Sequence, residues 1–78
     1  MKIQLAERVV SDPEIMDGKP TIEGTRVTVA KVVRLVATGR AMADICSDYP
    51  YLTQDDVKAA LEFSASEVEH TSYRALPA

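Results

Sequence analysis

The sequence predicts a mainly α domain: a helix-turn-helix-like (homeodomain-like) bundle of three helices, preceded by a small N-terminal β element. Two observations support this fold class. Apolar residues repeat with a helical period from Val29 onward, and two of the three glycines lie before that point, among residues that favour extended structure and turns. The 78 residues suffice for one small domain with a thin core. We expect this domain over residues 1–70 and a tail over residues 71–78.

The leader before the helices is predicted to consist of short extended segments and turns. Residues 1–7 carry little pattern, whereas residues 8–10 favour a short strand. The letters SDPE, residues 11–14, predict the start of a one-turn helix, because Asp can cap a helix and Pro suits its first position. Two further extended segments, in residues 21–22 and 25–29, are expected around a Glu-Gly turn at residues 23–24.

Three residues of the leader are predicted to be structural turn residues: Gly18, Pro20 and Gly24. Glycine reaches positive φ at little cost, and proline confines its segment to a loop or a sheet edge. This backbone role is the simplest explanation for the letters GKPTIEGTR at residues 18–26.

Two helices are predicted between residues 29 and 48. The first has Thr28 as its cap and Gly39 as its stop, and four valines at helical spacing form its inner face: Val29, Val32, Val33 and Val36. The second, over residues 41–48, ends before Pro50 and is expected to turn three side chains inward: Met42, Ile45 and Tyr49.

The third helix has the clearest start signal. Thr53 and Asp56 match a capping box, and Leu52 with Val57 matches a hydrophobic staple. The stripe expected to face the core is Val57, Ala60, Leu61, Ser64 and Val68. Phe63 lies beside this stripe, so it either packs on the first helix or marks a contact patch.

Charge is unevenly distributed along the chain. The net charge is −3, but residues 28–40 carry +3 and residues 41–70 carry −6 with His70 neutral. The acidic part includes most of the third helix. No apolar run reaches the roughly 18 residues that a membrane span needs, and no signal peptide is apparent, so a cytoplasmic location is expected.

No catalytic, cofactor or metal site is expected. Gly18 and Lys19 lack the earlier glycine and the following hydroxyl residue of a phosphate-binding loop. Cys46 and His70 are the only residues of their types, and they lie far apart without ligand spacing. The single histidine also leaves no set of nucleophile, base and orienting group, so we expect a binding protein and not an enzyme.

DNA binding is one candidate function, because helix-turn-helix proteins place their last helix in the major groove. The acidic third helix does not favour such use, because its carboxylates would repel phosphates. The candidate DNA-binding residues are instead basic side chains of the middle of the chain: Arg26, Lys31, Arg34 and Arg40. The alternative is that these residues form an ordinary solvated face, and Arg26 could equally hold its own loop.

Two stretches of the chain resemble a known family. RVVSDPEIMDGKPTIEGTRVTV, and then DICSDYPYLTQDDVKAAL after a helix that ends in glycine, are similar to the domain-of-unknown-function 433 family of small bacterial and archaeal proteins. Members are regarded as VapB-like antitoxins of toxin–antitoxin pairs, usually encoded beside a PIN-like ribonuclease toxin. The resemblance covers residues 8–63, with its Asp-Pro, Gly-Lys-Pro, Gly-Thr-Arg and Tyr-Pro-x-Leu-Thr elements in order.

The resemblance implies a type II antitoxin that binds and inhibits a PIN-like ribonuclease toxin, forms a homodimer and has no catalytic residues. The alternative function is a DNA-binding transcriptional autoregulator of its own operon, with operator DNA as a second partner. For the toxin we expect contacts through the acidic third helix and the tail. The candidate toxin-binding residues are Asp55, Glu62, Phe63, Glu69 and Tyr73.

Overall fold

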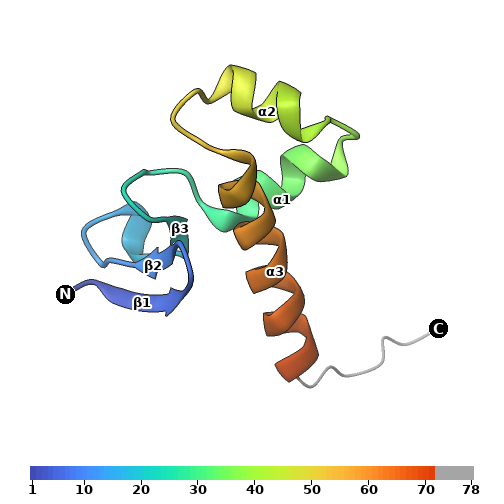
Figure 1. Ribbon diagram of the computed structural model, residues 1–78. Coiled ribbons are helices and arrows are strands. Elements are labelled where there is room, and N and C mark those ends of the chain that lie inside the picture. Colours follow the sequence, from blue (N-terminus) through green and yellow to red (C-terminus); the bar gives the residue numbers. More distant parts are fainter. Residues whose placement is uncertain (72–78) are drawn as a thin grey trace.

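The computed structural model describes residues 1–71 and shows three helices and a three-stranded antiparallel sheet that lies to one side of them (Figure 1). The expected mainly α, helix-turn-helix-like class is therefore wrong, because the chain is an α+β domain. The three expected helices are present. The N-terminal β element is also present, but it is a sheet that contributes to the common core and not a small addition to a helical bundle.

The sheet consists of β1 (Ile3–Ala6), β2 (Val9–Ser11) and β3 (Thr21–Ile22), in that spatial order. In β2, Val9 pairs with Ile22 and Val10 pairs with Gln4, and a bulge interrupts the pairing between β1 and β2. The expected strand at residues 8–10 corresponds to β2. In contrast, β1 lies in residues that showed little pattern, because as an edge strand it is exposed along most of its length.

The predicted helical turn at residues 11–14 is absent. Asp12 instead closes a tight turn, in which its Oδ1 accepts a hydrogen bond from Glu14 N and its carbonyl accepts one from Ile15 N, both at 2.9 Å. A single 3-10 turn follows at Met16–Gly18. Asp therefore satisfies the backbone locally, as it does in many turns, and no helix is nucleated.

The first two helices are α1 (Val29–Ala37) and α2 (Met42–Asp48). As predicted, the Thr28 side chain caps α1 by accepting from Lys31 N at 3.0 Å, and Gly39 follows α1 with a φ of +89°. Of the three side chains expected to face inward from the second helix, Ile45 is fully buried. Met42 and Tyr49 are half-buried against the core.

The third helix, α3 (Gln54–His70), is the longest, with 17 residues. Its capping box is confirmed: Thr53 Oγ1 accepts from Asp56 N and Asp56 Oδ2 accepts from Thr53 N, both at 3.1 Å. Val57 and Ala60 are buried as expected, but Val68 is 60% exposed, so its assignment to the core is wrong. Within residues 1–71, no helix combines the length and the apolar character needed to cross a membrane.

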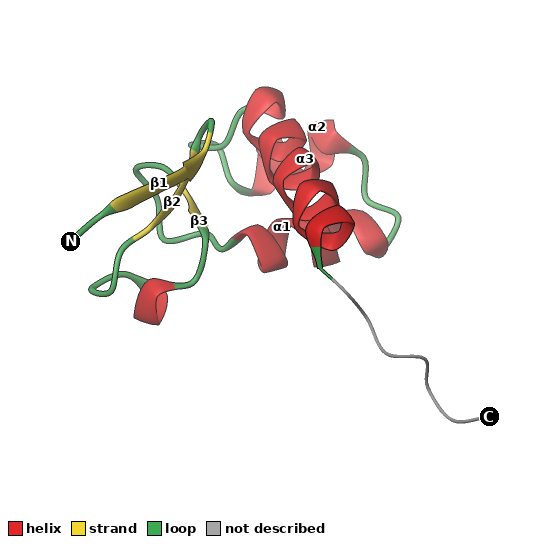
Figure 2. Ribbon diagram, turned by 90° about the horizontal axis from the view of Figure 1, so that it is seen from below, coloured by secondary structure: helices red, strands yellow, loops and turns green. Residues whose placement is uncertain are grey.

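The sheet lies beside the helices (Figure 2), and buried residues from both form one core. Val9 and Ile22 from the sheet are completely buried together with Val32, Ile45 and Val57 from the three helices. The sheet therefore places the β1–β2 turn beside α3, and this position creates the site described next.

Candidate functional site

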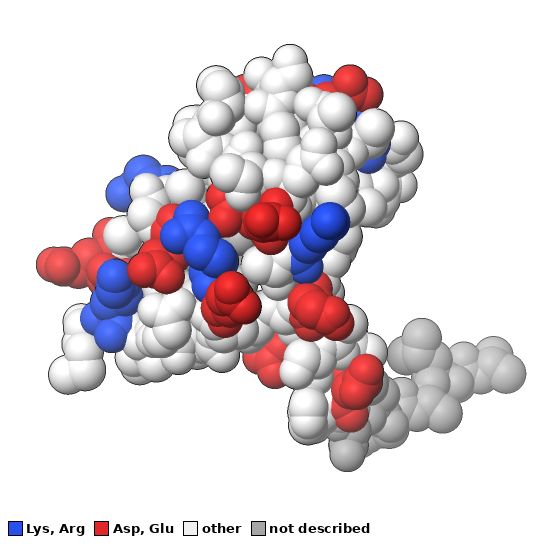
Figure 3. All heavy atoms as spheres, in the orientation of Figure 1, with Lys and Arg blue, Asp and Glu red and all other residues white. Residues whose placement is uncertain are grey.

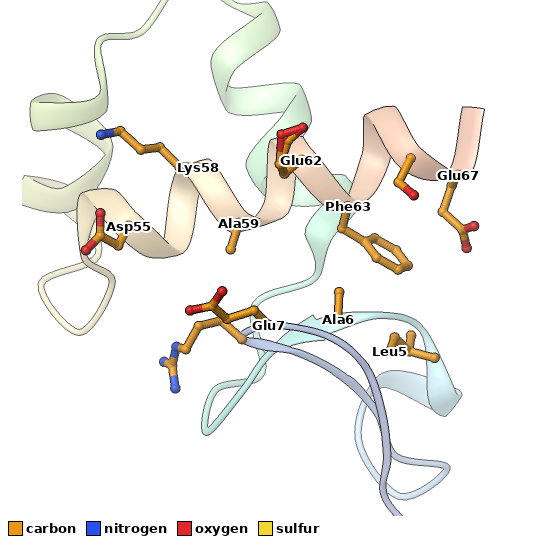
Figure 4. Close-up of a pocket in the computed structure, with 11 residues that line it drawn as sticks. Leu5, Ala6, Glu7, Asp55, Lys58, Ala59, Glu62, Phe63 and Glu67 are labelled. Atoms are coloured by element: carbon orange, nitrogen blue, oxygen red, sulfur yellow. The ribbon is translucent and has the colours of Figure 1, made fainter. Parts of the chain in front are cut away.

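A groove of about 660 Å³ lies between the β1–β2 hairpin and α3 (Figure 4). Its lining comes from two parts of the chain that are far apart in the sequence. The hairpin contributes Leu5, Ala6, Glu7 and Arg8, and α3 contributes Asp55, Lys58, Ala59, Glu62, Phe63, Ser66 and Glu67.

The inner surface of this groove is apolar. Ala59 and Phe63 point from α3 toward the hairpin, and Ala6 and Leu5 lie opposite Phe63 (Figure 4). Leu5 is 41% exposed, so part of its side chain faces water inside the groove. Phe63 and Ala6 also pack against the hydrophobic core, and this packing fixes the position of the groove wall. An apolar side chain of a ligand could therefore be buried here.

The rim of the groove carries an excess of negative charge. We call Glu7, Asp55, Glu62 and Glu67 the groove carboxylates. Within residues 1–71, none of them takes part in an ion pair. Figure 3 shows acidic and basic side chains gathered where the hairpin meets α3, with acidic ones continuing along the helix. Lys58 is the single lysine of the groove, so the rim favours cationic groups.

The other basic residue of the groove, Arg8, forms an ion pair with Asp56. Its Nε donates to Asp56 Oδ1 at 2.8 Å, and its Nη2 donates to the carbonyl of Glu23 at 3.2 Å. The carbonyl of Arg8 accepts from Glu23 N at 2.9 Å. Arg8 has a φ of +64°, a conformation that non-glycine residues rarely adopt. The surrounding contacts hold it there, and they join the hairpin, the turn after β3 and the start of α3.

Asp56 is a structural acid and not part of the rim. It is 3% exposed. Burial alone would raise the pKa of its carboxyl, but hydrogen bonds from Arg8 and from Thr53 N, together with the nearby positive charge of Arg8, hold that pKa below its ordinary value. The same contact raises the pKa of Arg8. In the sequence, the capping-box position of Asp56 indicated a role at the start of α3, but nothing indicated its burial or its ion pair with Arg8.

A second, smaller groove of about 310 Å³ lies on the other side of Phe63. Its lining comes from the segment before α1, from the first residues of α1 and from α3: Lys19, Pro20, Thr28, Val29, Ala30, Phe63, Ser64 and Glu67. Phe63 and Glu67 thus contribute to both grooves. Phe63 was expected either to pack on the first helix or to belong to a contact patch. The structure is compatible with both, because Phe63 is half-buried.

The groove collects three of the predicted toxin-binding residues, Asp55, Glu62 and Phe63. Glu69 is exposed on α3 but does not line the groove. Tyr73 lies outside the described residues. Sequence reasoning missed the contribution of the hairpin, Leu5 to Arg8, because nothing in the order of residues indicates that this turn lies beside α3.

None of the predicted DNA-binding residues lines the groove. Arg26 is exposed in the loop before α1, and Lys31 and Arg34 are exposed one turn apart on α1. Arg40 forms an ion pair with Asp48, so its charge is compensated.

The predicted turn residues lie together in the leader. Gly18 and Gly24 each have a φ of +80°. Beside them, the carbonyl of Pro20 accepts from Val29 N at 2.9 Å, which connects the leader to the start of α1.

Comparisons with known proteins give a family and no function. The family model described as "Protein of unknown function (DUF433)" matches residues 9–64. The chain is also 35% identical over 54 residues to the uncharacterized protein y4eO of Sinorhizobium fredii (strain NBRC 101917 / NGR234), an alignment that covers 69% of this chain but only 24% of that relative. No solved structure matches significantly. Because the family model covers well over half of the 78 residues, the chain belongs to the DUF433 family.

Proposed function

We propose that this protein is the antitoxin of a type II toxin–antitoxin pair and that it inhibits a PIN-like ribonuclease toxin by binding to it. The observation that carries this proposal is the groove between the β1–β2 hairpin and α3, with its apolar inner surface and the groove carboxylates on its rim. The antitoxin role itself comes from the resemblance of the sequence to its family, as described above.

The physical argument is complementarity. A ribonuclease binds a polyanion, so the surface around its active site is usually basic. Carboxylates on a rigid helix can take the place of phosphates on such a surface, and complementary charge both speeds association and selects the partner. Asp55 and Glu62 present this charge, while Phe63 and Leu5 offer apolar area that can be buried.

Co-expression with the product of the adjacent open reading frame tests the proposal. We expect the two proteins to co-purify as a complex. We also expect growth arrest when the neighbouring product is expressed alone, and recovery of growth when this chain is added. A neighbouring product that is not toxic, or that is toxic but neither binds this chain nor is relieved by it, would rule out the antitoxin role.

A second candidate is a DNA-binding autoregulator, favoured by the exposure of Arg26, Lys31 and Arg34. Reading two half-sites requires two copies, so this candidate also requires the expected homodimer. A mobility-shift assay on the promoter region, across a salt series and with and without the toxin, discriminates between the candidates. Binding through phosphates must weaken as salt rises. Loss of the shift in Lys31→Ala and Arg34→Ala variants would support it, and no salt-sensitive shift would exclude it.

A further inference from the structure

We propose that the groove binds an elongated, basic segment of the toxin, in which Lys or Arg side chains flank an apolar side chain that packs between Leu5 and Phe63. This inference rests on the proposed antitoxin function and specifies the part of the partner that is recognised. It follows from three properties of the groove: its length, the position of its apolar residues and the sign of its charge.

The length of the groove fits a segment of polypeptide better than a single side chain. Its α3 wall runs from Asp55 to Glu67. Twelve residue steps along a helix span about 18 Å, and an extended chain covers that distance with about five or six residues. A volume of about 660 Å³ likewise exceeds what one side chain fills.

The apolar contacts lie toward one end of the groove. Phe63, Ala6 and Leu5 lie close together toward the Glu67 end, whereas Asp55 and Glu7 lie toward the other end (Figure 4). Leu5 gains most from being covered, because it is an exposed leucine on an edge strand. A bound segment therefore needs an apolar side chain at the position that faces Leu5 and Phe63.

The charge on the rim selects basic neighbours for that apolar side chain. The groove carboxylates supply four negative charges, and Arg8 is neutralised by Asp56, so Lys58 is the remaining basic residue of the groove. A polyanion such as RNA would meet net repulsion here, and an acidic peptide would too. Charge complementarity thus commits the groove to a cationic segment.

Labelled peptides test this preference directly. The probe is a peptide of about six residues that alternates Lys and Leu. The comparison peptides replace Leu by Ser, or Lys by Glu. Fluorescence anisotropy gives the affinity, and amide chemical shifts of the labelled protein locate the contact. We expect binding of the Lys/Leu peptide alone, with shifts at residues 5–8 and 55–67. Equal binding of the Lys/Ser peptide, or shifts elsewhere, would overturn the inference.

Matched variants distinguish binding in the groove from nonspecific electrostatic attraction to the protein surface. Glu62→Lys is expected to weaken Lys/Leu binding about fivefold, while Glu69→Lys, on the same helix but outside the groove, leaves it unchanged. Leu5→Ser is expected to weaken it about tenfold, while Ile3→Ser, on the same strand outside the groove, has no effect. Circular dichroism confirms that each variant is folded. Equal effects within either pair would contradict a specific groove.

The same Glu62→Lys and Glu69→Lys variants then separate the inference from the proposed function. If the toxin binds the unaltered chain and Glu62→Lys weakens that complex selectively, both stand. If the toxin binds both variants equally well, the groove assignment fails and the antitoxin role survives. If no toxin binds the unaltered chain, the antitoxin role fails, and the assignment of the segment to a toxin fails with it.

Discussion

The two ends of α3 differ in almost every respect although both are rich in acidic residues. At the start, Asp56 is buried, bonded to Thr53 within the capping box and paired with Arg8 of the β1–β2 turn. At the end, Glu69 and His70 are exposed and Val68 is 60% exposed. Between them, the groove carboxylates face a hollow that has an apolar inner surface.

This difference teaches that residue type alone does not assign a role to an acidic side chain. Asp55 and Asp56 are neighbours with the same chemistry, yet one lines the groove and the other holds two parts of the fold together. Neighbouring side chains on a helix point about 100° apart, so Asp55 lies at the groove while Asp56 is buried. Variants of α3 should therefore fall into two groups: those near Asp56 change stability, and those in the groove change binding.

Among the acidic residues of α3, the largest expected effect on stability is that of Asp56→Ala. The variant loses the capping-box bond in which Asp56 Oδ2 accepts from Thr53 N, and it leaves Arg8 without its carboxylate, so we expect a loss of about 2 kcal/mol in the free energy of unfolding. The Arg8 side chain is 43% exposed, so water replaces part of its lost partner and the ion pair itself counts for little. Urea unfolding followed by circular dichroism measures the change. Asp55→Ala is the control, with under about 0.5 kcal/mol expected; similar losses in both would refute the distinction.

Low pH should weaken the contacts of Asp56 with Arg8 and Thr53. Because hydrogen bonds and the charge of Arg8 lower the pKa of Asp56 in the folded state, the folded chain binds fewer protons there than the unfolded chain. This contribution to stability is complete above the ordinary value of 3.8 and is lost as the pH falls through the lower, folded-state pKa. Urea midpoints measured from pH 5 to about pH 2 should fall more steeply for the unaltered chain than for Asp56→Asn. Parallel curves would mean that Asp56 does not titrate as an ion-paired acid.

The smallest effect is expected at the far end of the helix. Val68→Ser should change the free energy of unfolding by less than about 0.5 kcal/mol, because the side chain already faces water. Val57→Ser, the same exchange at a fully buried position, should cost at least about 2 kcal/mol. Thermal unfolding of the pair measures both. A large loss from Val68→Ser would indicate that this end of α3 is covered, for example by a second copy of the chain.

Signals confined to neighbouring residues predicted the local structure well. The capping residues Thr28 and Thr53 act through side chains that reach only three residues ahead, and both bonds are present as expected. The first and third helices accordingly begin within one residue of their predicted starts. The leader was harder to predict. Because β1 is exposed along most of its length, burial imposes no alternation of apolar and polar residues that a reader of the sequence could detect.

The site depends on contacts that no local signal encodes. Arg8 and Asp56 are 48 positions apart in the sequence. The sequence therefore indicated the capping box but not the bond between Asp56 and Arg8. Val68 was misplaced for a related reason. With nine residues, α1 spans about half the length of the 17-residue α3. The apolar pattern therefore continues into the last turns of α3, which extend beyond α1 and have no helix within residues 1–71 to pack on.

The groove has walls from opposite ends of the described chain, residues 5–8 and 55–67, and this origin has a thermodynamic consequence. The walls come together only when the sheet has docked on α3, so an unfolded chain offers no such hollow. A ligand of the groove therefore binds the native state alone and must raise the melting temperature. At concentrations above Kd, the increase grows with the logarithm of the ligand concentration. The melting temperature thus reports occupancy of the groove, and unlabelled basic peptides can be ranked by affinity from the increase that each one causes.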